Sequence, residues 1–250
     1  MSGYHTHKEL QWDTMKAFNY TSFQKAQSIE EVKDQLKTLD TELVGTDMQN
    51  LIPFNHTYLI ITRSVFEKIS TGYFENDSLM KKIDTHFGNY YFHALNEYVH
   101  QRSCPEAWNI TFDTCKKGKN FQFIYMALGV NAHVNNDLPQ TLHDVMNGDL
   151  FQKDFLLVNT IIAECLHEVV LSLHEKNHLI NMGKNVFENE YALFLNGIIQ
   201  KWRETAWRNY IELHNKQITK GIIETQAAKK AEILASIDSV VKIPKILLSI

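Results

Sequence analysis

The sequence predicts an all-α fold, a single compact bundle of about seven to nine helices. Only 4 prolines and 10 glycines occur among 250 residues, which is too few for a β architecture with many turns. Long stretches are rich in Leu, Ala, Lys, Glu and Gln, which favour helices. Neither an internal repeat nor a low-complexity linker divides the chain, so we expect one domain.

Composition narrows the class of protein. With 44% hydrophobic and 22% charged residues, the chain can bury a sizeable core. The net charge is −4, and acids and bases are interleaved, so we expect no nucleic-acid partner. Cys104, Cys115 and Cys165 have no CxxC spacing, which argues against a disulfide framework and a thiolate metal site. No signal peptide and no apolar run long enough for a bilayer are evident, so we expect a soluble, cytoplasmic protein.

The first half of the chain shows clear helix signals after residue 27. Residues 1–27 lack a period and are expected to form a loose arm, followed by a single helical domain over 28–250. Ser28 and Glu31 stand in capping-box relation at the start of a helix to about 43. Pro53 suits the first turn of a second helix that ends near 70. A third helix, capped by "NDS" at 76–78, carries aromatic residues around much of its circumference.

The second half continues in the same way. A short helix begins at Pro105, and an apolar helix covers 121–136. Pro139 is expected to push Leu138 out of the α region and to restart the chain as a short helix ending at 147. Helices over 151–183, 185–217 and 219–241 complete the bundle. We expect the apolar tail at 242–250 to pack against it.

The stretch "GVNAHVNNDLPQTLHDV" at 129–145 is the best candidate for a functional site. His133 and Asp137 are four residues apart, so a helix places them on one face, where they can share a divalent ion. A bend at Pro139 would bring His143 to the same ion. Imidazole and carboxylate donors suit zinc or a similar metal.

Four further residues belong to this hypothesis. His56 and Asp84 would complete the metal coordination if their helices face the central one. Asn131 or Asn135 would hydrogen-bond a substrate or a ligating group. The catalytic residues beyond these ligands are not indicated.

A structural interpretation of the same stretch competes with the metal site. Asp137 and Gln140 fit a capping box for a helix that starts at Leu138. The asparagines suit a helix end, and His133 fits a core histidine bonded to a backbone carbonyl. The spacing of these residues leaves both interpretations open.

The run "LGVNAHVNNDLPQTL" at 128–142 resembles a family of uncharacterised helical proteins, largely bacterial. These proteins share a Leu-Gly-(Ile/Val)-Asn-Ala-His-(Ile/Val)-Asn-x-Asp-Leu-Pro motif. The segments "FNHTYLIITRSV", "IDTHFGNYYFHAL", "DFLLVNTII" and "WRETAWRNYIEL" extend the resemblance from about 28 to 213. It implies a family without an established activity.

The order His133, Asp137, Gln140, His143 is also similar to the His-x3-Asp-x2-Gln-Pro-x-His segment of zinc-dependent phospholipase C and related nucleases. Those all-α enzymes use that histidine, aspartate and histidine as ligands of a trinuclear zinc site. The resemblance therefore implies zinc at His133, Asp137 and His143. In this chain the proline precedes the glutamine instead of following it.

These observations lead to two functional hypotheses. The first is a metal-dependent hydrolase of phosphoesters or other esters, in which a metal-bound water of lowered pKa attacks the substrate. The second is a non-enzymatic helical binding or structural module that uses the motif only as a capped helix junction. In "WRETAWRNY", Arg203, Trp207 and Arg208 fit either a cation–π cluster or an anion site. The sequence does not indicate an oligomeric state.

Overall fold

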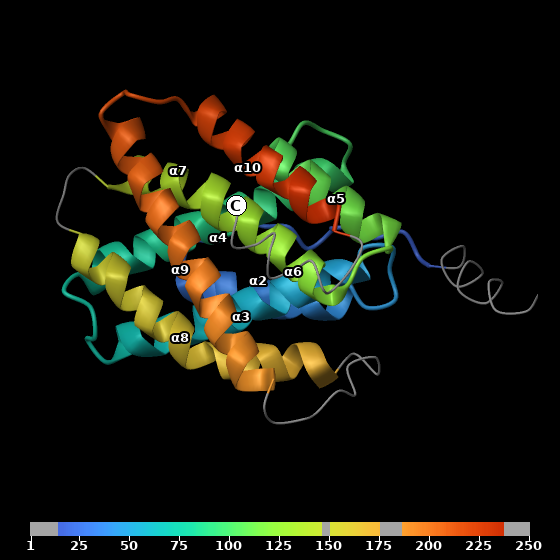
Figure 1. The fold of residues 1–250 in the computed structure, drawn as a ribbon, viewed down its shortest axis with the longest axis horizontal. Helices are drawn as coiled ribbons and strands as arrows, with labels where there is room; N and C mark the ends of the chain where they lie inside the picture. The colour runs from blue at the N-terminus through green and yellow to red at the C-terminus, as the bar shows by residue number, and fades with distance from the viewer. Residues whose placement is uncertain (1–14, 147–150, 176–186, 238–250) are drawn as a thin grey trace, which may run out of the picture.

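The computed structural model describes residues 15–146, 151–175 and 187–237, and these form a bundle of helices (Figure 1). Within them, the only β pairing is an isolated bridge between Lys16 and Thr46. The all-α prediction is confirmed. The helices, in chain order, are α2 (Ile29–Glu42), η1 (Gln49–Leu51), α3 (Ile52–Ser70), α4 (Asp77–Val99), α5 (Glu106–Lys117), α6 (Gln122–Asn131), η2 (Ala132–Asp137), α7 (Leu138–Val145), α8 (Gln152–Glu175), α9 (Phe187–His214) and α10 (Lys220–Ala235).

Two predicted helix starts are confirmed by their caps. The Ser28 side chain accepts a hydrogen bond from the Glu31 N–H at the start of α2, and the Asn76 side chain caps α4 at the Leu79 N–H. Each bond satisfies one of the backbone N–H groups that a helix start leaves without an intrahelical partner. The predicted apolar face of α2 is buried along its whole length.

The segment α6–η2–α7 forms the centre of the bundle. All residues from 123 to 142 are buried, as expected for a helix with neighbours on every side. Helices α3 and α10 pack on α6, while α9, α10 and α4 pack on η2 or α7. Figure 1 shows this segment passing through the middle of the molecule, between α10 and α3.

A glycine permits the close approach of α6 to α3. A Cβ atom built on Gly129 would lie 2.2 Å from Cγ of Phe54, far inside van der Waals contact. The side chain of Phe54 therefore occupies the space that any other residue at position 129 would need.

The prediction that Pro139 breaks the helix is wrong. Leu138 has helical angles, φ −61° and ψ −48°, and α7 follows η2 without a break in the helix. The reason is that η2 is a π-helix: the Leu138 N–H bonds the His133 carbonyl, five residues back. A wider π turn accommodates a proline that a regular α-helix would exclude. Gln140 also donates from its side chain to the Asn136 carbonyl, at 3.1 Å.

The described part of the N-terminal segment is packed on the bundle, unlike the loose arm that the sequence suggested. Phe18 and Tyr20 are buried. The Phe18 N–H donates to Asp47 Oδ1 at 2.8 Å, and Asn89 makes two hydrogen bonds to the backbone of Ala26. Residues 1–14 and 238–250 lie outside the described residues. The rest of the predicted arm and the whole of the predicted C-terminal tail at 242–250 fall within these two ranges.

Helix α8 corrects one statement made from the sequence. Over 152–172 it is long and apolar enough, by length and composition, to cross a bilayer, with a mean hydropathy of 1.6. Core helices of globular proteins often meet the same criterion. In this chain α8 packs on α3 and α9, and it supplies several side chains to the cavity described below.

Candidate functional site

His133 and Asp137 form a buried pair on η2. His133 Nδ1 lies 3.0 Å from Asp137 Oδ2, and their side chains are 3% and 0% exposed. The predicted proximity of the two residues is therefore correct. They contact each other directly, however, and do not converge on a point between them. π-helical turns are frequent at functional sites because they reorient side chains within a helix.

Asp137 accepts hydrogen bonds from three side chains. Besides His133, Trp108 Nε1 donates to Oδ2 at 3.0 Å, and Asn136 Nδ2 donates to Oδ1 at 2.8 Å. Asp137 itself has helical angles and makes no side-chain cap, so the interpretation of this residue as a helix cap is wrong. The structural reason is that the helix does not begin at Leu138, and no free N–H group needs a cap.

The hydrogen-bond pattern fixes how the pair is protonated. Burial lowers the pKa of His133, although Asp137 opposes the shift. Burial also raises the pKa of Asp137, and its three donors oppose that shift. Since N–H donors point at both carboxylate oxygens, we assign Asp137 as the carboxylate and His133 as the neutral ring with its proton on Nδ1. The lone pair of His133 is then on Nε2.

Nε2 of His133 has no hydrogen-bond partner although it is buried. Aromatic rings hold the imidazole in place: Phe87 stacks on it with 3.5 Å between ring centroids, and Tyr58 meets it edge-on at 4.4 Å. A buried nitrogen without a partner costs free energy unless a ligand or water satisfies it. This atom is therefore the clearest indication of a ligand in the described part of the chain.

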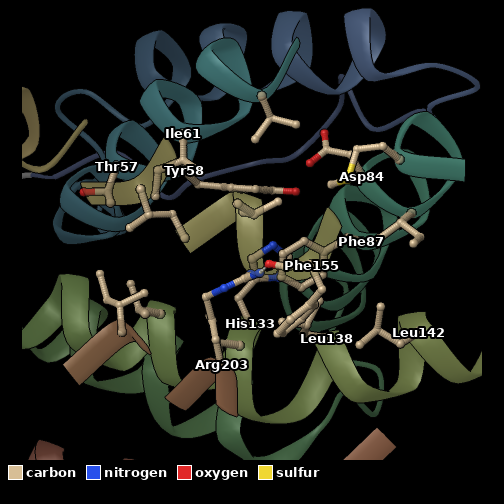
Figure 2. A pocket seen from close by; sticks show the side chains of 18 of the residues that line it. Thr57, Tyr58, Ile61, Asp84, Phe87, His133, Leu138, Leu142, Phe155 and Arg203 are labelled. Carbon is tan, nitrogen blue, oxygen red and sulfur yellow. Dashed lines mark hydrogen bonds between the residues drawn. The ribbon is translucent and has the colours of Figure 1, made fainter. Parts of the chain in front are cut away.

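His133 lines a cavity of about 80 Å³ in the middle of the bundle (Figure 2). The lining comes from α3, α4, the α6–η2–α7 segment, α8 and α9, and most of it is apolar. Of the residues that line it, only Ile61 and Phe87 are partly exposed; the others are buried.

Asp84 and Arg203 also line this cavity. Asp84, on α4, is 6% exposed, and its Oδ2 has no hydrogen-bond partner. Burial raises its pKa to about 7. Asp84 was predicted to complete the metal coordination if its helix faced the central one, and the structure brings it to the same cavity as His133.

Arg203 enters the cavity from α9. Its Nε donates to Asn159 Oδ1 at 2.5 Å and its Nη2 to the Phe155 carbonyl at 2.8 Å. The guanidinium carbon lies 4.2 Å from the centre of the Phe155 ring. A cation–π contact is thus present, as one of the two interpretations of this motif proposed, but its aromatic partner is Phe155. The ring of Trp207 packs on the rings of Phe155 and Tyr210.

The remaining predicted site residues lie elsewhere. His143 does not line the cavity, and its ring is 6.4 Å from that of His214. His56 pairs with Asp40, with 2.5 Å between His56 Nδ1 and Asp40 Oδ2. In the described residues, no three His, Cys, Asp or Glu side chains come together as a metal site.

Asn131 and Asn135, which were predicted to bind substrate, face α10. Asn131 donates to the Ala227 carbonyl at 2.9 Å and accepts from Asn135 at 3.1 Å. Asn135 in turn accepts from Lys230 at 3.3 Å. Neither asparagine lines the cavity, because they lie on a different side of η2 from His133.

Three residues of the site were not predicted from the sequence: Trp108, Phe87 and Phe155. Trp108 had one usable signal, since a buried tryptophan needs an acceptor for its N–H, and Asp137 provides it. The two phenylalanines carry no such signal, because a core phenylalanine and a cavity-lining phenylalanine look alike in sequence.

The family model described as "Family of unknown function (DUF5995)" matches residues 29–242. The chain belongs to this family. The match spans all the helices that build the cavity. No curated protein and no solved structure matches the chain.

Proposed function

We propose that this protein binds a small, mainly apolar molecule in the central cavity, and that Nε2 of His133 accepts a proton or a hydrogen bond from it. The observation that carries the proposal is the buried Nε2 atom without a partner at the wall of an apolar cavity. Cavities of this kind, apolar with a few polar groups, are typical of small-molecule sites.

The surroundings of His133 support a role as base. The carboxylate of Asp137 orients the ring and keeps the proton on Nδ1, as an acid residue does for the base of many hydrolytic sites. Trp108 and Asn136 hold that carboxylate. A histidine with a lowered pKa remains neutral at physiological pH, so that its Nε2 can accept a proton.

Binding of 1-hexanol, a short alcohol with one proton donor, tests the proposal. We expect ligand-observed NMR to detect binding to the full chain, and the ¹⁵N shift of His133 Nε2 to change on titration. Hexane, which has no donor, should leave that nitrogen shift unchanged. The variant Val158→Phe fills the cavity and should abolish binding, because Val158 lines it.

Leu156→Phe is the matched control, since Leu156 lies on the same helix and is 49% exposed. It should bind 1-hexanol like the unchanged protein. The proposal fails if 1-hexanol does not bind, or if it binds equally well after Val158→Phe in a protein that remains folded.

A metal-dependent hydrolase is the second candidate, and one observation favours it. Metal-ligating histidines usually donate their other ring N–H to a carboxylate, which is the relation of His133 to Asp137. Nε2 of His133 would be the ligand atom, Asp84 the nearest carboxylate of the same cavity, and zinc the ion. Asp137 would then bind Nδ1 of the histidine and would not coordinate the ion itself. The ion would supply a Lewis acid for the hydrolysis of an ester.

Elemental analysis of protein purified without a histidine tag distinguishes the two candidates. The metal hypothesis predicts stoichiometric zinc, manganese or iron that is lost in His133→Ala and kept in His143→Ala, since His143 does not line the cavity. Folded protein without metal that still binds 1-hexanol would contradict the metal hypothesis and leave the first proposal in place.

A further inference from the structure

The cavity contains a cationic group whose charge no carboxylate neutralises. Arg203 is 6% exposed, and none of the ion pairs among the described residues includes it. Its two hydrogen bonds go to neutral oxygens. They use two of the five N–H donors of the guanidinium group. A buried arginine without a counter-charge is costly, and a bound anion would remove much of that cost.

The acids near the cavity do not balance Arg203. Burial is the only cause of the shifted pKa of Asp84 and of Arg203, and among the described residues no ion pair joins the two groups. Figure 2 shows them on different sides of the His133 ring. Asp137 does not line the cavity, and its oxygens are already bonded to three N–H donors.

The two ionisable groups also differ in how they can become neutral. The pKa of Asp84, about 7, allows it to take up a proton near physiological pH. The pKa of Arg203 is lowered by burial to about 9, so the arginine keeps its charge there. Below pH 7 Asp84 therefore holds its proton while Arg203 keeps its charge, so the charge in the cavity is positive, which favours a negatively charged ligand over a positively charged one.

The size of the cavity restricts the ligand further. Its volume is about 80 Å³. A short aliphatic chain is small enough for such a space, whereas a fused ring system is not.

We infer that the ligand is a short aliphatic carboxylate with a hydroxyl or similar donor, and that Arg203 binds its carboxylate while His133 accepts from the donor. The inference rests on the proposed function. It adds the sign of the charge, the residue that recognises it and the size of the ligand. A guanidinium group can bind a carboxylate through two parallel N–H bonds, which gives direction as well as affinity.

Three probes with the same chain isolate the effect of the charged end: 1-hexanol, 6-hydroxyhexanoate and 6-amino-1-hexanol. Each has a hydroxyl group for His133, and they differ only in the group at the other end. Calorimetric titration of the full chain at about pH 6, where Asp84 holds its proton, should give at least about tenfold tighter binding for 6-hydroxyhexanoate than for 1-hexanol, the effect of one charge-assisted hydrogen bond. The amine should bind more weakly than the alcohol.

Arg203→Met removes the charge and keeps most of the side-chain volume. In this variant 6-hydroxyhexanoate should lose its tenfold advantage while 1-hexanol binds as before. Arg208→Met is the matched control on the same helix, because Arg208 is exposed and does not line the cavity. If Arg203→Met does not fold, the ratio of the three affinities in the unchanged protein decides the question.

The outcomes separate this inference from the proposed function. Equal binding of 1-hexanol and 6-hydroxyhexanoate would overturn the anion inference and leave the cavity as a binding site. Preference for the amine would also overturn it and would make Asp84 the recognising group. If none of the three probes binds, both proposals fail. An advantage of the carboxylate that survives Arg203→Met would show that another group recognises the anion.

Discussion

The two sides of the α6–η2 segment carry similar polar residues but differ in whether their polar atoms have hydrogen-bond partners. On one side, Asn131 and Asn135 bond each other, the Ala227 carbonyl and Lys230, so that α10 closes over them. On the other side, Asp137 is saturated by donors, but the outer nitrogen of His133 is left without a partner at a cavity. The first side is explained by structure alone, whereas the second needs a ligand or water.

The comparison shows where a buried polar group indicates function. Burial does not distinguish the two sides, since Asn131 is 0% and His133 3% exposed. The difference lies in which polar atoms have partners and in what the remaining atom faces. Four predictions test this difference, from the largest expected effect to the smallest.

Asp137→Ala should have the largest effect on stability. It leaves the N–H groups of His133, Trp108 and Asn136 buried without their acceptor, and breaking a buried charged network costs about 3–5 kcal/mol. Urea denaturation followed by circular dichroism measures the loss. Asp34→Ala, on an exposed face of α2, should change stability by less than about 0.5 kcal/mol. A similarly small loss for Asp137→Ala would contradict the proposed network.

Gly129→Ala tests the close packing of α6 against Phe54 of α3, a residue that lines the cavity. The added Cβ would meet the ring of Phe54 at 2.2 Å, and overpacking of this kind costs about 1–3 kcal/mol. Gly197→Ala on α9 is the matched control, because nothing lies within 4 Å of its added Cβ. It should raise the unfolding free energy by about 0.4–1 kcal/mol. The same denaturation experiment compares the two, and opposite signs are expected.

Asn135→Ala should separate stability from binding. It removes the partner of Asn131 Oδ1 and of Lys230 Nζ, which should cost about 1–2 kcal/mol. Because Asn135 does not line the cavity, 1-hexanol should bind the folded variant as tightly as the unchanged protein. A weakened affinity without unfolding would mean that the two sides of η2 act as one site.

Asp84→Asn should change how stability depends on pH. The pKa of Asp84 is raised from 3.8 to about 7 in the folded chain, so the folded state keeps a proton that the unfolded state has already lost. Stability therefore falls as pH rises from about 4 to above 7. The variant should gain at least about 1 kcal/mol at pH 8, the equivalent of nearly one pKa unit, and little at pH 4.

Denaturation at both pH values measures the gain, with Asp34→Asn as the control. Asp34 is exposed, so its replacement should leave the pH profile unchanged. Equal shifts at pH 4 and pH 8 for Asp84→Asn would show that burial does not hold the proton on Asp84.

Much of the fold followed from local features of the sequence. The Ser28 and Asn76 caps, the buried face of α2 and the central apolar segment are where their residues predicted them. These features depend on neighbours within a few positions, which a single sequence displays directly. The prediction at Pro139 was wrong because the π turn before it depends on packing around η2, and a local rule does not include that packing.

The sequence by itself determined that His133 and Asp137 lie together on one helix face, because four residues span one helical turn. Only the tertiary structure decided what the pair does with its bonding capacity. Trp108 reaches Asp137 across 29 positions, while Phe87 and Arg203 come to the same cavity from α4 and α9. Such contacts arise from the packing of whole helices, so the spacing of residues within one helix cannot reveal them.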